Sequence, residues 1–248
     1  MIPLIRGWTD VQRTPQANTR LGVTLAAVAG AANAGGFLAV NQYTSHMTGV
    51  LSGMADALVL GHTDIALVGL AMLMAFLTGA MCTAILVNWG MRHHMHSAYG
   101  LPLLLEAALL LVFGLFGGAI AVAAHLFVPL TVVLLCFIMG LQNAVITKIS
   151  RAEIRTTHIT GLVTDMGIEL GKLLYVNPSP SELPVRANRD KLRLQGKLIV
   201  AFAFGALVGA FGFKHVGYLS TVPLAVALLA LVIKPIWKDM RPFAYPAA

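Results

Sequence analysis

Six apolar stretches of membrane-crossing length set the strongest limit on what this chain can fold into. A helix that crosses a bilayer needs about 20 predominantly apolar residues, and the stretches lack the strand-like alternation of a membrane β-barrel. The last two are short and need flanking residues to complete a crossing. The sequence therefore predicts an all-α, polytopic membrane protein with crossings at 21–40, 65–89, 101–126, 128–149, 198–213 and 216–233.

The composition supports this fold class and excludes several kinds of function. Hydrophobic residues make up 58% of the chain and charged residues 11%, whereas soluble domains carry about 25% charged residues. So few charges cannot cover a water-soluble body, which excludes a soluble enzyme, a nucleic-acid-binding protein and a disordered chain. The net charge of +7 is therefore expected in cytoplasmic loops.

Two less apolar segments, 44–61 and 157–175, are either two further crossings or re-entrant segments that enter the membrane and return. The basic residues decide between these alternatives, because Lys and Arg strongly favour the cytoplasmic side. Six crossings with a cytoplasmic N-terminus place 16 of the 17 Lys and Arg residues in the cytoplasm and leave only Lys214 outside. Eight crossings place 5 of them outside. We therefore predict six transmembrane helices plus two short re-entrant or broken helices.

The same two segments carry an internal repeat. An Asn-Ala pair precedes each segment near the end of the previous crossing, at Asn33 and Asn143. Each half then contains three crossings, and because three is an odd number, the second half must be inverted relative to the first. Inverted 3+3 repeats are common in transporters. At a shift of 112 residues, the repeat aligns Thr44-Ser45-His46-Met47-Thr48-Gly49 with Thr156-Thr157-His158-Ile159-Thr160-Gly161.

Each motif is expected at the N-terminus of a short helix inside the membrane. Such an N-terminus carries partial positive charge and free N–H groups, which suit an anion or another polar solute. A simpler alternative is that Thr44, Ser45, Thr156 and Thr157 only cap their own helices. In the first reading the two motifs meet at a central site near the membrane midplane. The residues expected to bind the solute there are Thr44, His46, Thr48, Gly49, Gln142, Asn143, Arg155, Thr157, His158, Thr160 and Gly161.

The titratable candidates have alternative roles. Histidine both donates and accepts hydrogen bonds and changes charge near neutral pH, which suits a solute contact or a proton-linked gate; a structural hydrogen bond between the halves is the alternative. Asp165 is the candidate for coupling to a proton or cation, and a local charge pair with Glu169 and Lys172 is the alternative. Arg155 either faces the solute or stays at the cytoplasmic surface. Glu106 is expected to reach the membrane interface.

The chain divides into two membrane repeats with cytoplasmic flanks. The N-terminal arm lacks the apolar core of a signal peptide. The predicted partners are the lipid bilayer and a small-molecule solute, and a homo-oligomer is compatible with the sequence; no nucleic acid, metal or cofactor is predicted. The predicted parts are an N-terminal arm at 1–20, a first repeat at 21–126, a second repeat at 127–236 with a cytoplasmic loop at 176–197, and a cytoplasmic tail at 237–248.

Several of these motifs resemble a known family. They are Met139-Gly140-Leu141-Gln142-Asn143-Ala144, Arg155-Thr156-Thr157-His158-Ile159-Thr160-Gly161, Thr164-Asp165-Met166-Gly167 and Ser45-His46-Met47-Thr48-Gly49. Together they resemble the YoaK family (domain of unknown function 1275) over most of the chain. The resemblance implies a small bacterial inner-membrane protein and supplies no substrate. Two positions depart from the family pattern: Asn33 stands where an acid is usual, and Val50 replaces an Asn, which weakens a polar role in the first half.

The sequence supports three functional hypotheses. The favoured one is a transporter or channel for a small polar solute, with anions among the candidates, and not an enzyme. The sequence contains no nucleotide-binding loop, so the energy for transport would come from a gradient or a separate subunit. The second is a non-catalytic scaffold or solute-binding subunit that needs a partner. The third is an intramembrane enzyme with histidine as general base, and it is the weakest because no metal set or paired carboxylates accompany the histidines.

Overall fold

The structure is a computed structural model that describes residues 8–11, 13–122, 124–150, 154–177 and 183–240. These residues form helices without strands, which confirms the predicted all-α fold for the described part of the chain. The helices are α1 (Pro15–Val40), α2 (Met47–Val59), α3 (Thr63–Arg92), α4 (Gly100–Val122), α5 (Ala124–Ile149), α6 (Ile159–Leu174), α7 (Arg189–Val216), the 3-10 turn η2 (Gly217–Ser220) and α8 (Thr221–Met240).

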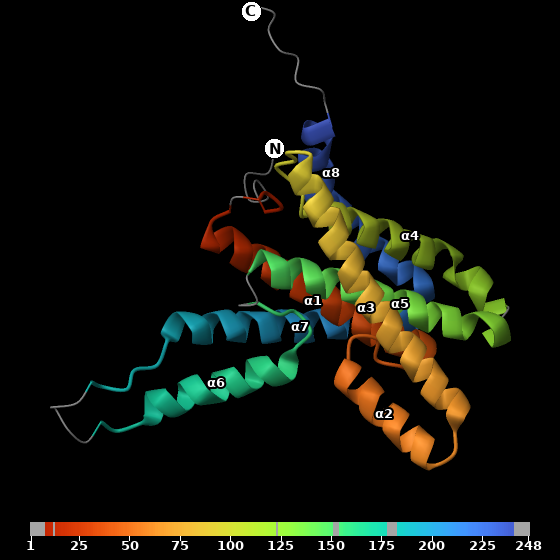
Figure 1. Ribbon diagram of the computed structural model, residues 1–248, viewed down its shortest axis with the longest axis horizontal. Helices are drawn as coiled ribbons and strands as arrows, with labels where there is room; N and C mark the ends of the chain where they lie inside the picture. Colours follow the sequence, from red (N-terminus) through yellow and green to blue (C-terminus); the bar gives the residue numbers. More distant parts are fainter. Residues whose placement is uncertain (1–7, 12, 123, 151–153, 178–182, 241–248) are drawn as a thin grey trace, which may run out of the picture.

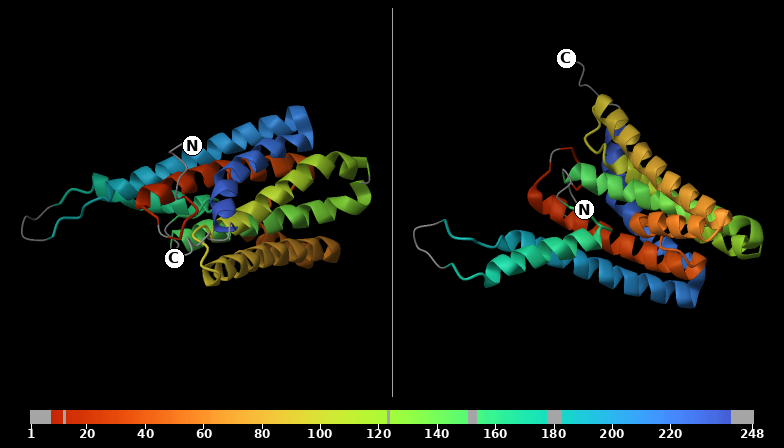
Figure 2. Two further views of the ribbon diagram at one scale, coloured as in Figure 1. Left: turned by 90° about the horizontal axis from the view of Figure 1, so that it is seen from above. Right: turned by 60° about the horizontal axis from the view of Figure 1, so that its bottom comes forward.

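Four long helices lie in a row, and α4 and α8 form a pair beside them. α1 packs against α7 on one side and α5 on the other, and α5 packs in turn against α3. The order across the molecule is therefore α7, α1, α5, α3 (Figure 2). α4 packs against α8 and connects that pair to α5. The short α2 lies on α3 and the short α6 lies on α7 (Figure 1).

Small residues bring α1 and α7 into backbone contact. A side-chain carbon at Gly205 would overlap with the carbonyl oxygen of Ala27, and one at Gly209 with that of Ala31. Gly30 makes the reciprocal contact with the backbone of α7. Because both contacts advance by one turn along each helix, α1 and α7 run in the same direction. Such close approach is the usual way in which membrane helices associate, since burial of apolar surface gains little inside lipid.

The same kind of contact joins α3 to α5. A side-chain carbon at Gly79 would overlap with the carbonyl oxygen of Phe137, and one at Gly140 would overlap with the backbone of α3. One turn beyond Gly79, the Thr83 hydroxyl donates a 2.9 Å hydrogen bond to the carbonyl oxygen of Leu141. α3 and α5 therefore also run in the same direction. In both pairs, the first helix of one predicted repeat packs on the third helical segment of the other.

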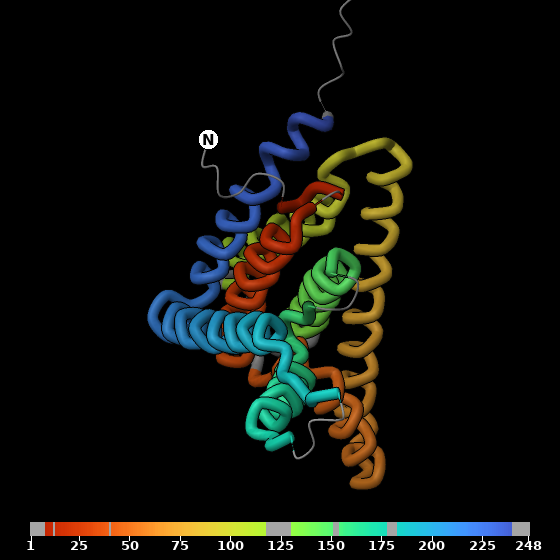
Figure 3. Tube along the Cα trace, turned by 90° about the vertical axis from the view of Figure 1, so that its left-hand side faces the viewer, coloured from red at the N-terminus to blue at the C-terminus, as the bar shows by residue number. Residues whose placement is uncertain are grey.

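Five helical stretches in the described residues are long and apolar enough to cross a membrane. They are Pro15–Ala39, Thr63–Arg92, Gly100–Gly117, Leu130–Ile149 and Arg189–Asp239. The last stretch contains α7 and α8, which diverge from η2 (Figure 3). Large apolar side chains are exposed along the outer faces of α3 and α7, as expected for helices in contact with lipid: Leu67, Leu70, Leu77, Ile85, Val200, Phe204, Leu207 and Phe211.

Four predicted boundaries are wrong. The predicted crossing at 101–126 is too long and the repeat boundary after residue 126 is too late, because α4 ends at Val122 and α5 begins at Ala124. α1 begins at Pro15 and not after residue 20, because the Thr14 side chain caps it and proline suits the first helical position. α7 begins at Arg189, so the predicted loop at 176–197 ends nine residues early; the Asn188 side chain caps this charged first turn. α8 begins at Thr221 and not at 216, because Gly217 adopts φ +70° and breaks the helix.

The predicted arm, loop and tail lie partly outside the described residues. This applies to 1–7 and 12 in the arm, 178–182 in the loop and 241–248 in the tail. Within the described part of the tail, 237–240 continue α8 through Met240.

We predict that Gly205→Ala lowers the thermal stability of the purified protein, because the added methyl group collides with the carbonyl of Ala27. Overpacking of this kind costs about 1–3 kcal/mol, which works against the roughly 0.5–1 kcal/mol that alanine gains in a helix. Gly196→Ala is the matched control, since it lies in the same helix with nothing within 4 Å of the added carbon. Thermal unfolding in detergent measures both variants. Equal melting temperatures would contradict the close contact between α1 and α7.

Candidate functional site

Asn33 holds the connection that leads from α1 into α2. Its side-chain oxygen accepts hydrogen bonds from the backbone N–H of Ser45 at 3.2 Å and from the Ser45 hydroxyl at 2.9 Å. α1 continues for seven residues beyond Asn33 and ends at Val40, where Asn41 adopts a left-handed conformation. The chain therefore turns back by about 10 Å along α1 before α2 begins. The sequence showed Asn33 as a repeated residue and as a departure from the family pattern, and the structure gives it a positioning role.

Asn143 holds the equivalent connection from α5 into α6. Its side-chain oxygen accepts a 2.6 Å hydrogen bond from the Thr157 hydroxyl, and its NH₂ group donates to the carbonyl oxygen of Met139 at 2.8 Å. α5 continues for six residues beyond Asn143 before it ends at Ile149, so this chain also turns back by about 9 Å. Asn143 thus positions the connection, and any contact with a solute would be made in addition.

Both short helices begin without a side-chain cap. His46 is the N-cap residue of α2 and His158 is that of α6, and neither helix receives a capping hydrogen bond from the N-cap side chain. The first N–H groups of an α-helix have no partner inside the helix and need one from elsewhere. The alternative in which the threonines and Ser45 only cap these helices is therefore wrong, because the hydroxyl of Ser45 and that of Thr157 are directed to Asn33 and Asn143.

The two histidine rings fold back over the first turn of their helices. A side-chain carbon at Gly49 would overlap with the imidazole of His46, and one at Gly161 would overlap with that of His158. Glycine at the third helical position is therefore required by the ring, and not by the backbone. This explains why His and Gly recur together, three residues apart, in the two motifs.

A buried threonine precedes each histidine by two residues. Thr44 and Thr156 are both fully buried, and neither hydroxyl has a hydrogen-bond partner among the described residues. A hydroxyl in a protein interior normally has a partner, because leaving it unpaired costs about 1–3 kcal/mol. Thr44 was predicted as a site residue, whereas Thr156 was considered only as a cap. The structure brings both to the same place relative to a short helix.

The two helix starts are connected through the central pair α1 and α5. The side-chain NH₂ of Gln142 in α5 donates a 3.1 Å hydrogen bond to the carbonyl oxygen of Leu25 in α1. Near the other ends, a side-chain carbon at Gly36 of α1 would contact Leu135 of α5. Residue numbers thus fall along one helix as they rise along the other, so α1 and α5 are antiparallel. Gln142 is fully buried, and its oxygen has no partner among the described residues.

The remaining predicted residues are exposed in this conformation. His46, Thr48, Arg155, His158 and Thr160 all have exposed side chains. Two hollows lie elsewhere: an open apolar groove of about 410 Å³ between α3 and α5, and a hollow of about 610 Å³ near the end of α3. None of the predicted site residues lines either hollow. The two helix starts are therefore accessible from outside the protein in this conformation.

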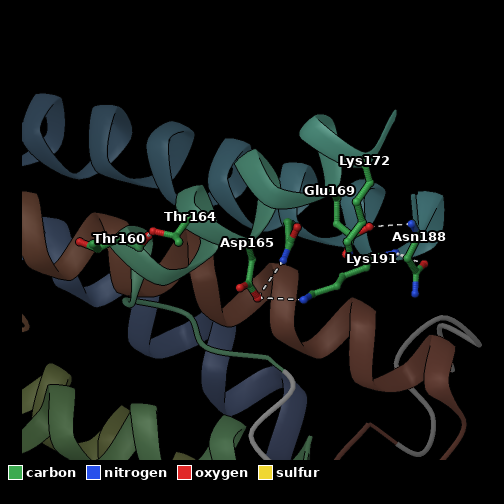
Figure 4. A network of polar contacts seen from close by, with 8 residues as sticks. Thr160, Thr164, Asp165, Glu169, Lys172, Asn188 and Lys191 are labelled. Carbon is green, nitrogen blue, oxygen red and sulfur yellow. Dashed lines mark hydrogen bonds and ion pairs between the residues drawn. The ribbon is translucent and has the colours of Figure 1, made fainter. Parts of the chain in front are cut away.

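A polar network attaches α6 to the first turns of α7 (Figure 4). Asp165 accepts a hydrogen bond from Gln195 at 3.3 Å and lies 3.1 Å from the ammonium group of Lys191. The predicted local pair is present one turn further on, where Glu169 lies 2.9 Å from Lys172. The role of Asp165 in coupling stays a prediction, and its carboxylate already has two partners on α7.

Glu169 also joins α6 to the connection that precedes α7. Its second carboxylate oxygen accepts a 2.7 Å hydrogen bond from the backbone N–H of Asn188. This hydrogen bond and the one from Lys172 lower the pKa of the Glu169 carboxyl, against the opposing effect of burial. The charged form of Glu169 is therefore the one that the folded protein stabilises.

Glu106 is the residue that the sequence analysis misplaced. It was expected to reach the membrane interface, yet its side chain is 0% exposed. Glu106 follows the first residue of α4 by six positions, about 9 Å along the helix. A glutamate side chain has only two methylene groups, too few to span that distance to water.

The comparisons with known proteins identify the family. Residues 21–234 match the family described as protein of unknown function (DUF1275). The chain belongs to the DUF1275 family. This confirms the family expected from the motifs, and the match covers both short helices and the connections that precede them. No curated protein and no solved structure matches the chain.

We predict that Asn33→Leu exposes the connection before α2, because it removes the acceptor of both Ser45 hydrogen bonds. Hydrogen bonds of this kind are worth about 0.5–1.5 kcal/mol each, so amide hydrogen exchange in residues 41–49 should accelerate by about 10-fold. Asn33→Asp is the matched control, because a carboxylate oxygen keeps the acceptor, and its exchange should stay close to that of the wild type. Equal exchange in the two variants would contradict the positioning role of Asn33.

Proposed function

We propose that this protein is a membrane transporter or channel for a small polar solute, with anions as the favoured class. The observation that carries the proposal is the pair of uncapped helix N-termini at His46 and His158. Each follows a buried threonine hydroxyl that has no partner among the described residues, and each is attached to one of the two central helices. Helix N-termini that lack a side-chain cap at equivalent positions suit a ligand that accepts hydrogen bonds.

The helix directions support an inverted repeat. α1 and α7 run one way, and α3 and α5 run the other way, because α1 and α5 are antiparallel. α4 and α8 are also antiparallel, since Thr221 at the start of α8 donates to Leu110 while Ile236 near its end lies beside Gly100. The long helices of the first half, α1, α3 and α4, then alternate in direction. Their counterparts α5, α7 and α8 alternate in the opposite sense. This is the arrangement expected of the inverted 3+3 repeat.

The helix lengths support six crossings and two re-entrant segments. The stretch Arg189–Asp239 would be about 77 Å long as one helix, more than twice the roughly 30 Å hydrocarbon core. We therefore count α7 and α8 as two crossings separated by η2. α2 with 13 residues and α6 with 16 residues are about 20 and 24 Å long and fall short of a crossing. Each begins beside an Asn located well inside its neighbouring long helix.

The predicted residues divide by role in this proposal. The N–H groups at the two helix starts, with the Thr44 and Thr156 hydroxyls behind them, would donate to an anion. His46 and His158 would add a donor or an acceptor over each start. Thr48 and Thr160 lie one residue beyond the first helical residue and present further hydroxyls. The amide of Gln142 joins α5 to α1 next to Asn143, and its oxygen has no partner among the described residues.

The packing suggests how access could alternate. α2, α3 and α5 form one connected group, and α6, α7 and α1 form the other, so each short helix would move with its own group. The two groups meet along α1 and α5, which contact each other less extensively than α1 contacts α7 or α5 contacts α3. Rocking at this boundary would open the two helix starts first to one side and then to the other. We place the protein in the bacterial inner membrane with both termini cytoplasmic.

We predict that the protein makes liposomes permeable to at least one small polar probe. Proteoliposomes would be shocked osmotically with formate, nitrate, phosphate or glycerol, and recovery of volume would be followed by light scattering. The double variant His46→Ala/His158→Ala should slow the recovery by about 10-fold or more, which corresponds to about 1.4 kcal/mol. Absence of recovery with every probe would contradict the transporter proposal.

A matched pair of glycine variants tests the site within α2. Gly49→Ala should reduce the flux as strongly as the loss of His46, because the methyl group displaces the imidazole. Gly53→Ala, one turn further on in the same helix with nothing within 4 Å, should leave the flux unchanged. Equal flux in these two variants would remove His46 from the site.

We predict that the two short helices enter from opposite sides of the membrane. In a background with Cys82 and Cys136 replaced by alanine, a membrane-impermeant maleimide should label His62→Cys from outside the cell. It should label Arg186→Cys only after the membrane is permeabilised. Both positions are exposed, so access to the reagent is limited by the membrane alone. Labelling of both variants from the same side would rule out an inverted repeat.

A further inference from the structure

Glu106 is an acid with no partner inside the apolar core. Its side chain is 0% exposed, and neither carboxylate oxygen has a hydrogen-bond partner among the described residues. It lies within the candidate span Gly100–Gly117. A bare carboxylate in such a place is expensive, since a charge that is taken out of water needs a paired charge or several hydrogen bonds. The protonated form carries no charge and avoids that cost.

The surroundings along α4 offer nothing that would stabilise a negative charge. Leu103, Ala107 and Leu110, which lie three or four residues from Glu106, are all 0% exposed and belong to the same apolar core. The packing partner α8 contains no charged residue from Thr221 to Ile233. Glu106 therefore has no counterpart in α8, although α4 and α8 correspond in the proposed repeat.

The helices packed against α4 bring few titratable groups to this level. The charged residues of α8 lie at its C-terminal end. Lys234 and Lys238 are exposed there, and the Asp239 carboxylate accepts hydrogen bonds from Ser97. α3 carries Asp64 in its first turn, Arg92 at its end and the thiol Cys82. α5 carries His125 near its start, Lys148 at its end and the thiol Cys136. η2 contributes only the phenol of Tyr218.

Gln142 offers a neutral group at a similar depth. α4 and α5 are consecutive and packed together. At 1.5 Å per residue along each helix axis, Glu106 lies about 24 Å from the connection between them and Gln142 about 27 Å. The Gln142 oxygen is a second buried acceptor without a partner in the described residues. A proton on Glu106 supplies a donor in a region that otherwise contains unpaired acceptors.

We propose that Glu106 is a proton-binding site that couples proton movement to transport, a proposal that rests on the transporter function proposed above. In the packed conformation the carboxyl holds a proton. When α4 separates from its neighbours, water reaches Glu106, and the proton leaves to one side of the membrane. Access then alternates while the site is empty, a proton binds from the other side, and α4 packs again. Each cycle thus moves one proton across, with no bond other than O–H formed or broken.

The chemistry favours a proton over a metal cation. Sodium, magnesium and calcium ions need several oxygen ligands in a defined arrangement. The described residues contain no group of three or more His, Cys, Asp or Glu side chains that could hold a metal ion. One carboxyl in an apolar environment provides a place for a proton and for little else.

Infrared spectroscopy of the full-length protein tests whether Glu106 binds a proton. A protonated carboxyl in an apolar environment has a C=O stretch that is separate from that of a carboxylate and shifts in D₂O. We expect a band that is present in the wild type near neutral pH and absent from Glu106→Gln. Glu106→Met serves as a second variant, because it also removes the carboxyl and fills the core without a polar group. Identical carboxyl bands in the wild type and in both variants would overturn the proposal.

Transport under an imposed pH gradient tests the coupling. The probe is the one among formate, nitrate, phosphate and glycerol that the wild type moves fastest. The wild type should accumulate this probe several-fold against its own gradient, whereas Glu106→Gln should only equilibrate it. Accumulation by Glu106→Gln equal to that of the wild type would overturn the coupling. If the wild type moves none of the probes, the proposed function fails, and the infrared band alone decides whether Glu106 is a proton site.

Discussion

Backbone groups that leave a helix need hydrogen-bond partners, and inside a membrane only the protein can supply them. In the proposed arrangement, this constraint applies to both connections to the short helices. Asn33 and Asn143 supply acceptors from the middle of long helices and hold Ser45 and Thr157 beside them. Each connection is thereby brought back along its helix before the next helix begins. Without these amides, neither connection would be tied back to the middle of its long helix.

The position of the asparagines depends in turn on close contacts between long helices. Gly205 and Gly209 let α7 touch the backbone of α1, and Gly79 with Thr83 does the same for α3 and α5. The halves of the chain are therefore interleaved and not packed side by side as separate domains. This interleaving leaves a thinner boundary between α1 and α5, where Gln142 spans the two helices. A protein that changes conformation needs such a boundary between rigid groups.

Much of the fold could be predicted because it depends on local pattern. Apolar run length identified the long helices, and the repeated His-x-Thr-Gly motif identified the starts of both short ones. The errors have a common origin. The capping of α1 by Thr14 and of α7 by Asn188 was overlooked because boundaries were taken from hydropathy alone. The depth of Glu106 was misjudged because one turn from a helix end was taken to mean contact with water.

The sequence by itself determined the helical fold, the repeated motifs and the family, because these follow from residue type and spacing along the chain. The tertiary structure decided which atoms are left without partners. Whether the Thr44 hydroxyl, the Thr156 hydroxyl or the Glu106 carboxyl is satisfied depends on side chains contributed by helices that are distant in sequence. A hydrogen bond requires two groups to meet within about 3 Å, and no one-dimensional pattern specifies such a meeting between distant parts of a chain.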